Sequence, residues 1–184
     1  MTFERAVEFV LRWEGGLVKD PMDRGGLTRW GISQAYHPGL DIDNLTREQA
    51  IEIYRTDYWN RIRGDDLPEE LAFVTFDAAV NCGPGNAARF LQRALGVKDD
   101  GVLGPKTMDR AWACDPRATA IHAIQARARY YTSVFTRHPS QLRFLNGWLA
   151  RIIDLAAQVH ACTTCGARGT LQGRGPGDDD RFGG

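Results

Sequence analysis

The sequence predicts a mainly α-helical protein with one small β excursion, and three observations carry that prediction. Signals that start and stop helices recur along most of the chain. A strongly apolar segment at residues 71–80 indicates a buried central helix. Residues 17–33 are instead rich in Gly, Pro and Asp with short β-prone pieces, which is typical of a hairpin or an extended loop.

Three helices are expected in the first half of the chain. The first follows Thr2, a suitable N-cap, and ends at the Gly-Gly pair of residues 15–16. The second opens with a capping box at residues 46–49 and runs to about Trp59. The third is the apolar segment, which the Gly-Pro pair at residues 83–84 terminates.

Prolines mark helix starts in the second half, where the missing N–H of a first helical residue costs nothing. The elements expected there are a helix at about 86–95 ended by Gly96, a turn-rich connector at 97–104, a helix from Pro105, a long helix from Asp115-Pro116 toward Arg137 and, after Pro139, a last helix at about 141–160. The tail from Gly166 is too polar and Gly-rich to bury a core, so residues 166–184 are expected to be disordered.

The charge balance excludes strong electrostatic steering toward nucleic acid, because 23 basic residues face 23 acidic ones. No apolar run approaches the roughly 20 residues that cross a bilayer, so no stable membrane insertion is expected. The N-terminus lacks the pattern of a signal peptide. We therefore expect synthesis in the cytoplasm, with release by another route if the target lies outside the inner membrane.

Neither a metal nor a cofactor is expected. Cys162 and Cys165 form a single C-x-x-C, whereas a zinc ribbon needs two such pairs. Reduced thiols near a frayed C-terminus are the simpler interpretation. The four histidines, which we expect to be structural or at the surface, lack metal-ligand spacing; they are His37, His122, His138 and His160.

The first helix carries a carboxylate on its apolar side. Phe3, Ala6, Val7 and Val10 form a stripe that reaches Glu14 one turn later. Partial burial and the negative end of the helix dipole both favour the protonated form of Glu14. That form is the one a general acid needs in order to protonate a glycosidic oxygen. The alternative is an ordinary Glu at a helix end before Gly-Gly.

A second carboxylate follows in a Gly-rich, polar stretch, where Asp23 is expected to stay ionised. Two carboxyls in contrasting environments are what glycoside hydrolysis requires. Thr28 offers a hydroxyl that could position the attacking water. Asp20 is the alternative second carboxylate, and both aspartates could instead be ordinary turn formers.

Several further side chains are candidates for binding a glycan. Tyr54, Tyr58 and Trp59 share one predicted helix, and Trp30 adjoins the predicted hairpin. Aromatics at this spacing pack cores more often than they bind ligands, but sugars also stack on aromatic faces. Asp77 and Asn81 lie one turn apart on the apolar helix. They are either a buried pair holding the fold together, or Asn81 donates to a sugar N-acetyl group.

The chain resembles the glycoside hydrolase family 108 muramidases over roughly residues 3–135. The motifs that carry the resemblance are Glu14-Gly15-Gly16, Asp20-Pro21-x-Asp23-x-Gly25-Gly26-x-Thr28-x-x-Gly31-Ile32, Ile53-Tyr54-Arg55-x-x-Tyr58-Trp59, Phe76-Asp77-x-Ala79-Val80-Asn81-x-Gly83, Leu91-Gln92-x-Ala94-Leu95-Gly96-Val97 and Asp100-Gly101-x-x-Gly104-Pro105-x-Thr107. The last motif looks like the peptidoglycan-binding lobe that accompanies this catalytic region.

This resemblance implies a lysozyme-like fold, with a catalytic region at residues 1–95 and a peptidoglycan-binding lobe at 96–165. It implies an N-acetylmuramidase that hydrolyses the β-1,4 bond between N-acetylmuramic acid and N-acetylglucosamine, with Glu14 as the acid. Such proteins occur as phage or prophage endolysins and act in the periplasm or cell wall. The expected partner is the glycan strand, and the expected state is a monomer.

Three other function classes compete with this one. A lytic transglycosylase would use Glu14 alone and leave a 1,6-anhydro product, and an ionised Asp23 argues against it. A non-catalytic peptidoglycan-binding or secretion-assisting protein would have a vestigial site, and intact Glu14, Asp23 and Thr28 argue against that. A nucleic-acid module is disfavoured by the charge balance.

Overall fold

The computed structural model describes residues 2–14, 18–19 and 27–166, with residues 18–19 and 162–166 described for the backbone alone. The predicted mainly α fold is confirmed in this part of the chain. Its α-helices are α1 (Phe3–Glu14), α2 (Arg47–Tyr54), α3 (Glu69–Cys82), α4 (Pro84–Leu95), α5 (Pro105–Trp112), α6 (Pro116–Arg137) and α7 (Leu145–Gly166). A π-helix, η1 (Arg55–Trp59), continues α2, and two 3₁₀ helices are η2 (Gly64–Asp66) and η3 (Pro139–Phe144).

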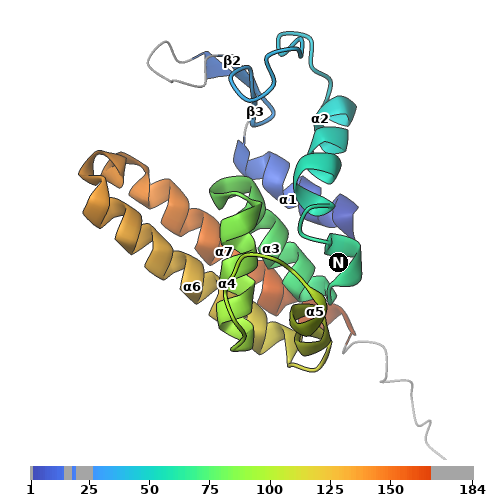
Figure 1. Ribbon diagram of the computed structural model, residues 1–184. Helices are drawn as coiled ribbons and strands as arrows, with labels where there is room; N and C mark the ends of the chain where they lie inside the picture. Colours follow the sequence, from blue (N-terminus) through green and yellow to red (C-terminus); the bar gives the residue numbers. More distant parts are fainter. Residues whose placement is uncertain (1, 15–17, 20–26, 167–184) are drawn as a thin grey trace, which may run out of the picture.

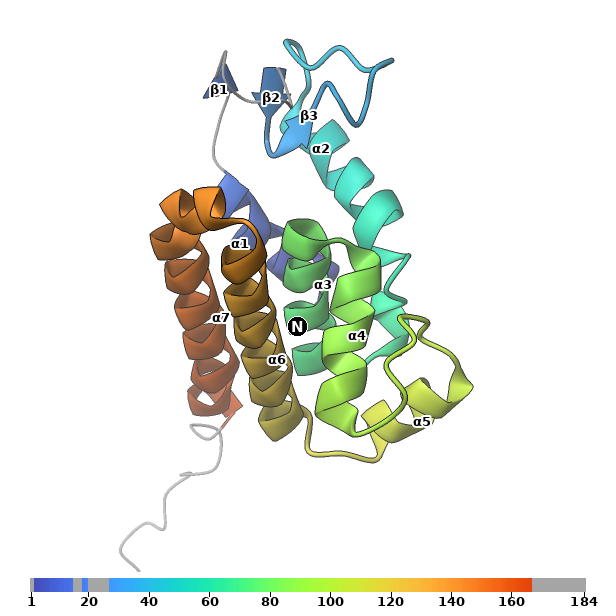
Figure 2. The same ribbon diagram turned by 60° about the vertical axis from the view of Figure 1, so that its left-hand side comes forward.

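The predicted hairpin region contains a small antiparallel sheet. Its strands are β1 (Val18–Lys19), β2 (Leu27–Arg29) and β3 (Ile32–Ser33), with β2 in the middle. Thr28 lies opposite Val18 on one side and Ser33 on the other. The sheet and α2 stand at one end of the molecule, above α1 (Figures 1 and 2).

Helix α3 lies at the centre of the helical body. Nine of its consecutive residues, 71–79, are buried, which explains why this stretch of the sequence is largely apolar. It packs against α1, α4 and α6. Helices α6 and α7 run antiparallel along one flank, and their shared tip at η3 points toward the sheet end (Figure 2).

Local chemistry accounts for most of the helix boundaries. The capping box of α2 is confirmed, since Thr46 Oγ1 accepts from the Gln49 N–H at 3.2 Å and Gln49 Oε1 accepts from the Thr46 N–H at 2.9 Å. Proline occupies the start of α4, α5 and α6. Gly96 ends α4 in the left-handed conformation that glycine adopts without strain.

Several boundaries differ from the prediction. The last α-helix does not begin at 141, because residues 139–144 form a 3₁₀ helix after His138, and α7 starts at Leu145. The helix at 86–95 begins two residues earlier, at Pro84. The expected disorder of the tail concerns residues that, apart from Gly166, lie outside the described part. The side chains of Cys162 and Cys165 also lie outside it. None of the described helices is long and apolar enough to cross a membrane.

Candidate active site

Glu14 is the last residue of α1, and the turn between β2 and β3 rests directly on it. A Cβ on Gly31 would lie 2.8 Å from both Cβ and Cγ of Glu14 and 2.4 Å from the Tyr54 hydroxyl. Gly31 also has a positive φ of +76°. Glycine is therefore required here for space and for conformation. The hydroxyl of Tyr54 donates to the carbonyl of Trp30 at 2.9 Å and so ties this turn to α2.

Trp30 itself is held in the left-handed region, with φ +54°. This conformation is unfavourable for a bulky residue, and such strain clusters at functional sites. Its ring is partly buried against the core. The sequence thus places two residues with positive φ in succession where the sheet meets the catalytic candidate.

The Glu14 carboxyl is half-buried, with 23% of the side chain exposed, and it is paired with Arg151. Arg151 Nη1 donates to Glu14 Oε1 at 2.6 Å. The same guanidinium donates through Nε to Asp77 Oδ1 at 2.8 Å. One arginine of α7 therefore bridges the end of α1 and the middle of α3. Nothing in the sequence around Glu14 indicated this partner, which lies 137 residues away.

A second arginine completes a buried network behind this pair. Arg127 Nη1 donates to Asp77 Oδ2 at 2.5 Å, and Arg127 Nε donates to the Tyr131 hydroxyl, also at 2.5 Å. The Tyr131 hydroxyl in turn donates to Asn81 Oδ1 at 2.7 Å. Asp77 and Asn81 are thus joined through α6 rather than to each other. Oδ1 of Asn81 is therefore engaged, whereas its amide N–H₂ makes no hydrogen bond with the described residues.

The charges of this network compensate one another. Burial acts to raise the pKa of Asp77, but Arg127 and Arg151 outweigh it and hold that pKa below its ordinary value. Burial likewise opposes ionisation of both arginines, while Asp77 keeps the pKa of each above its usual range. Arg151 adds a cation beside Glu14 that the sequence did not reveal.

The tyrosines around Glu14 are neutral at ordinary pH. Burial raises the pKa of Tyr54 well above its usual value, and the charge of Glu14 adds to the effect. Burial also raises the pKa of Tyr58, with smaller contributions from Asp57 and Glu14. These neutral hydroxyls provide hydrogen-bonding groups without a competing negative charge.

The structure separates the predicted aromatic candidates. Tyr54 and Trp59 are buried, with 1% and 2% exposure, so neither offers a ring face to a sugar. Tyr58 is partly buried, with its ring centroid 5.6 Å from that of Tyr54. Tyr58 and Trp30 therefore remain the candidates for contact with a glycan, and Tyr54 acts through the Trp30 carbonyl.

Of the remaining predicted site residues, Thr28 is described and Asp20 and Asp23 are not. Thr28 occupies the central strand, three residues before Gly31, and its hydroxyl makes no hydrogen bond with the described residues. Asp20 and Asp23 lie outside the described part of the chain. No group of three or more His, Cys, Asp or Glu side chains that could hold a metal ion exists among the described residues.

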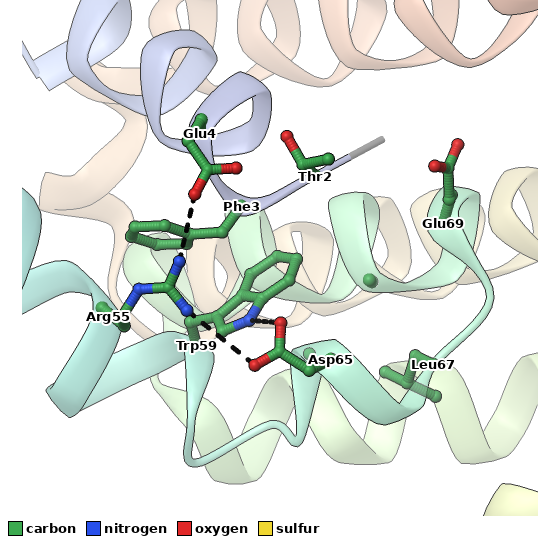
Figure 3. A pocket seen from close by; sticks show the side chains of 10 residues that line it. Thr2, Phe3, Glu4, Arg55, Trp59, Asp65, Leu67 and Glu69 are labelled. Atoms are coloured by element: carbon green, nitrogen blue, oxygen red, sulfur yellow. Dashed lines mark hydrogen bonds and ion pairs between the residues drawn. The ribbon is translucent and has the colours of Figure 1, made fainter.

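A cavity of about 330 Å³ lies at the other end of α1 (Figure 3). There Arg55 pairs with Glu4 at 3.2 Å and with Asp65 at 3.8 Å, and its guanidinium lies 4.1 Å from the centre of the Phe3 ring. The Trp59 indole N–H donates to Asp65 at 2.8 Å. These groups satisfy one another and join the start of α1 to η1 and η2, so the cavity has a structural explanation.

Two family models match successive parts of the chain. The family model for glycosyl hydrolase 108 matches residues 7–83, and the model described as a predicted peptidoglycan domain matches residues 86–153. Among solved structures, the chain is similar to Brucella abortus SagA, with 31% identity, 86% of this chain and 94% of that chain covered, and a TM-score of 0.74. A search of curated proteins finds no match.

Proposed function

The chain belongs to the glycosyl hydrolase 108 family, which makes it a lysozyme-like peptidoglycan hydrolase, and we propose that it is an N-acetylmuramidase with Glu14 as its general acid. It would cleave the β-1,4 bond that follows N-acetylmuramic acid. The observation that carries the proposal is the position of the Glu14 carboxyl. This carboxyl is half-buried where α1 meets the sheet, and two residues with positive φ hold the neighbouring turn against it.

The chemistry follows from the two oxygens of this carboxyl. Oε1 accepts from Arg151, whereas Oε2 makes no hydrogen bond with the described residues. In the protonated acid Oε2 would carry the proton and donate it to the glycosidic oxygen as the bond to the sugar C1 breaks. The resulting carboxylate would be stabilised by the guanidinium at 2.6 Å.

Substrate contacts would come from both sides of Glu14. Trp30 and Tyr58 belong to the side formed by the sheet and α2–η1, and the amide N–H₂ of Asn81 belongs to the helical side. Asp23, in its Gly-rich stretch, is proposed to activate water or to stabilise positive charge at C1, with Thr28 assisting. The enzyme is proposed to act as a monomer in the periplasm or cell wall, reached by an endolysin-like release route.

A matched pair of variants tests the acid assignment. Glu14→Gln keeps the shape of the side chain and removes the proton, so the rate of sacculus solubilisation should fall to less than about a hundredth of wild type, in line with the 10²–10⁴ that general acids contribute. Glu8→Gln makes the same change on the same helix, at an exposed residue paired with Arg47, and should retain wild-type activity. Equal activity of both variants would remove Glu14 from the mechanism.

A further inference from the structure

The arginine that contacts Glu14 comes from the second half of the chain. Arg151 and Arg127 both lie in residues 86–153, the region that matches the predicted peptidoglycan domain. Glu14 and Asp77 lie in residues 7–83, the region that matches the hydrolase model. The carboxylates of one region are therefore paired with arginines of the other, and no described residue of 7–83 supplies a positive charge at these contacts.

We propose that Arg151, anchored by Asp77, is a positioning residue for Glu14, so that the region matching the peptidoglycan domain completes the acid site as well as any wall contact it makes. This inference rests on the proposed function of Glu14. Three contacts support it: the Nη1 bond to Glu14, the Nε bond to Asp77, and the bond from Arg127 that fixes the other Asp77 oxygen.

The fork geometry of arginine explains why this residue type is needed. A guanidinium presents several N–H groups in one plane and can bind two carboxylates at once. Arg151 has only 6% of its side chain exposed, and Asp77 is fully buried, so the guanidinium has little freedom to move. The Glu14 carboxyl is thereby held by Oε1, which leaves Oε2 as the oxygen that carries the transferred proton.

Arg151 also brings a positive charge into contact with the Glu14 carboxyl. Among the described residues, the other titratable groups near Glu14 are Tyr54 and Tyr58, which are neutral, and Asp77, which acts through Arg151. Asp154 of α7 accepts a hydrogen bond at 3.0 Å from the indole N–H of Trp13, the residue before Glu14. Arg151 is the cation in direct contact with the carboxyl among the described residues, so its removal should make Glu14 harder to ionise.

The test compares Arg151→Gln and Arg151→Lys in the full-length chain. For Arg151→Gln, kcat should fall about 10- to 100-fold with KM within about threefold, because proton transfer is misaligned while the substrate contacts remain. The alkaline limb of the pH–rate profile should move up by about one unit or more, since an opposite charge at contact distance has gone. Arg151→Lys should restore that limb while recovering kcat in part, because an ammonium keeps the charge and loses the fork.

A second readout does not depend on turnover. The ¹³C carboxyl signal of Glu14, assigned by its loss in Glu14→Gln, should titrate at higher pH in Arg151→Gln than in wild type, and near wild type in Arg151→Lys. Arg129→Gln, at an exposed position on α6, is the matched control and should change neither readout. Thermal unfolding identifies any variant that fails to fold. If Arg151→Gln does not fold, the Lys variant decides: wild-type kcat in it would overturn the need for the fork.

The outcomes separate this inference from the proposed function. If wild type releases no fragments and the Glu14 signal still shifts in Arg151→Gln, the muramidase proposal fails and the contact stands. If wild type is active but neither the pH limb nor the signal moves, the positioning role is overturned and the muramidase proposal stands. A purely structural role for Arg151 would lower the active fraction without moving the pH limb, and that result would also count against the inference.

Discussion

Asp77 should be among the most stabilising polar residues of the fold. It is fully buried on α3 and accepts from Arg127 at 2.5 Å and from Arg151 at 2.8 Å, whose side chains are 1% and 6% exposed. Asp77→Asn preserves the shape and removes the charge, which leaves the buried Arg127 cation without a compensating anion among the described residues, since its other side-chain partner, Tyr131, is neutral. Breaking a buried pair in this way costs about 3–5 kcal/mol. That is about a fifth or more of the roughly 5–15 kcal/mol typical of a folded domain.

An exposed pair in the same chain provides the control. Asp99 accepts from Arg93 at 2.6 Å, but these side chains are 43% and 51% exposed. Asp99→Asn should therefore lower the free energy of unfolding by at most about 1 kcal/mol. Urea denaturation of both variants, with unchanged m-values, measures the difference. A cost below about 1 kcal/mol for Asp77→Asn would refute the claim that burial makes this ion pair indispensable.

The same network has a pH signature. Two arginines hold the pKa of Asp77 below its ordinary value despite burial, so its charge stabilises the fold fully above about pH 4, the usual value for an unfolded carboxyl. That contribution is lost as the pH falls through the lower pKa of the folded state. Wild-type stability should thus decline more steeply below about pH 4 than that of Asp77→Asn. Parallel acid profiles of the two proteins would contradict this assignment.

Three further outcomes are expected. Gly31→Ala places a methyl group 2.4 Å from the Tyr54 hydroxyl and 2.8 Å from Glu14, so thermal unfolding should show a loss of about 1–3 kcal/mol in stability. Activity should fall more than in the exposed control Gly39→Ala, and unchanged activity would show that the turn does not constrain the site. Gln92→Leu leaves the Gly101 N–H and the Val102 carbonyl without their buried partner, so urea denaturation should show a free energy of unfolding lower by about 1–3 kcal/mol. An unchanged free energy would mean that water replaces the lost side-chain amide. Asp23→Asn should reduce kcat less than Glu14→Gln does, and the reverse order would overturn the division of roles between the two carboxyls.

Local signals made most of the fold predictable. A capping box, three prolines at helix starts and a left-handed Gly96 each act through neighbouring residues, so they can be read from the sequence. The π-helical continuation at residues 55–59 and the 3₁₀ turn at 139–144 could not be read in this way. Both keep helical periodicity nearly intact, and tertiary packing selects between such closely related forms.

The site was predictable in part for the same reason. The position of Glu14 on the apolar stripe of α1 is a local property, whereas its pairing with Arg151 depends on how α7 packs beside α1 and α3. Burial likewise distinguishes Trp59 from Tyr58, since neighbouring residues on one helix differ in which side faces the core. Arginine on a long helix is most often a surface residue, so nothing in the sequence singled out Arg127 or Arg151.

Mass spectrometry of the soluble fragments from purified sacculi tests the central claim most directly. Wild type should release fragments that end in reducing N-acetylmuramic acid, and Glu14→Gln, verified as folded, should release none. Ends of the 1,6-anhydro type would make the protein a lytic transglycosylase. Fragments that end in reducing N-acetylglucosamine would contradict the assignment of the cleaved bond, and the absence of any fragment from wild type would contradict catalysis itself.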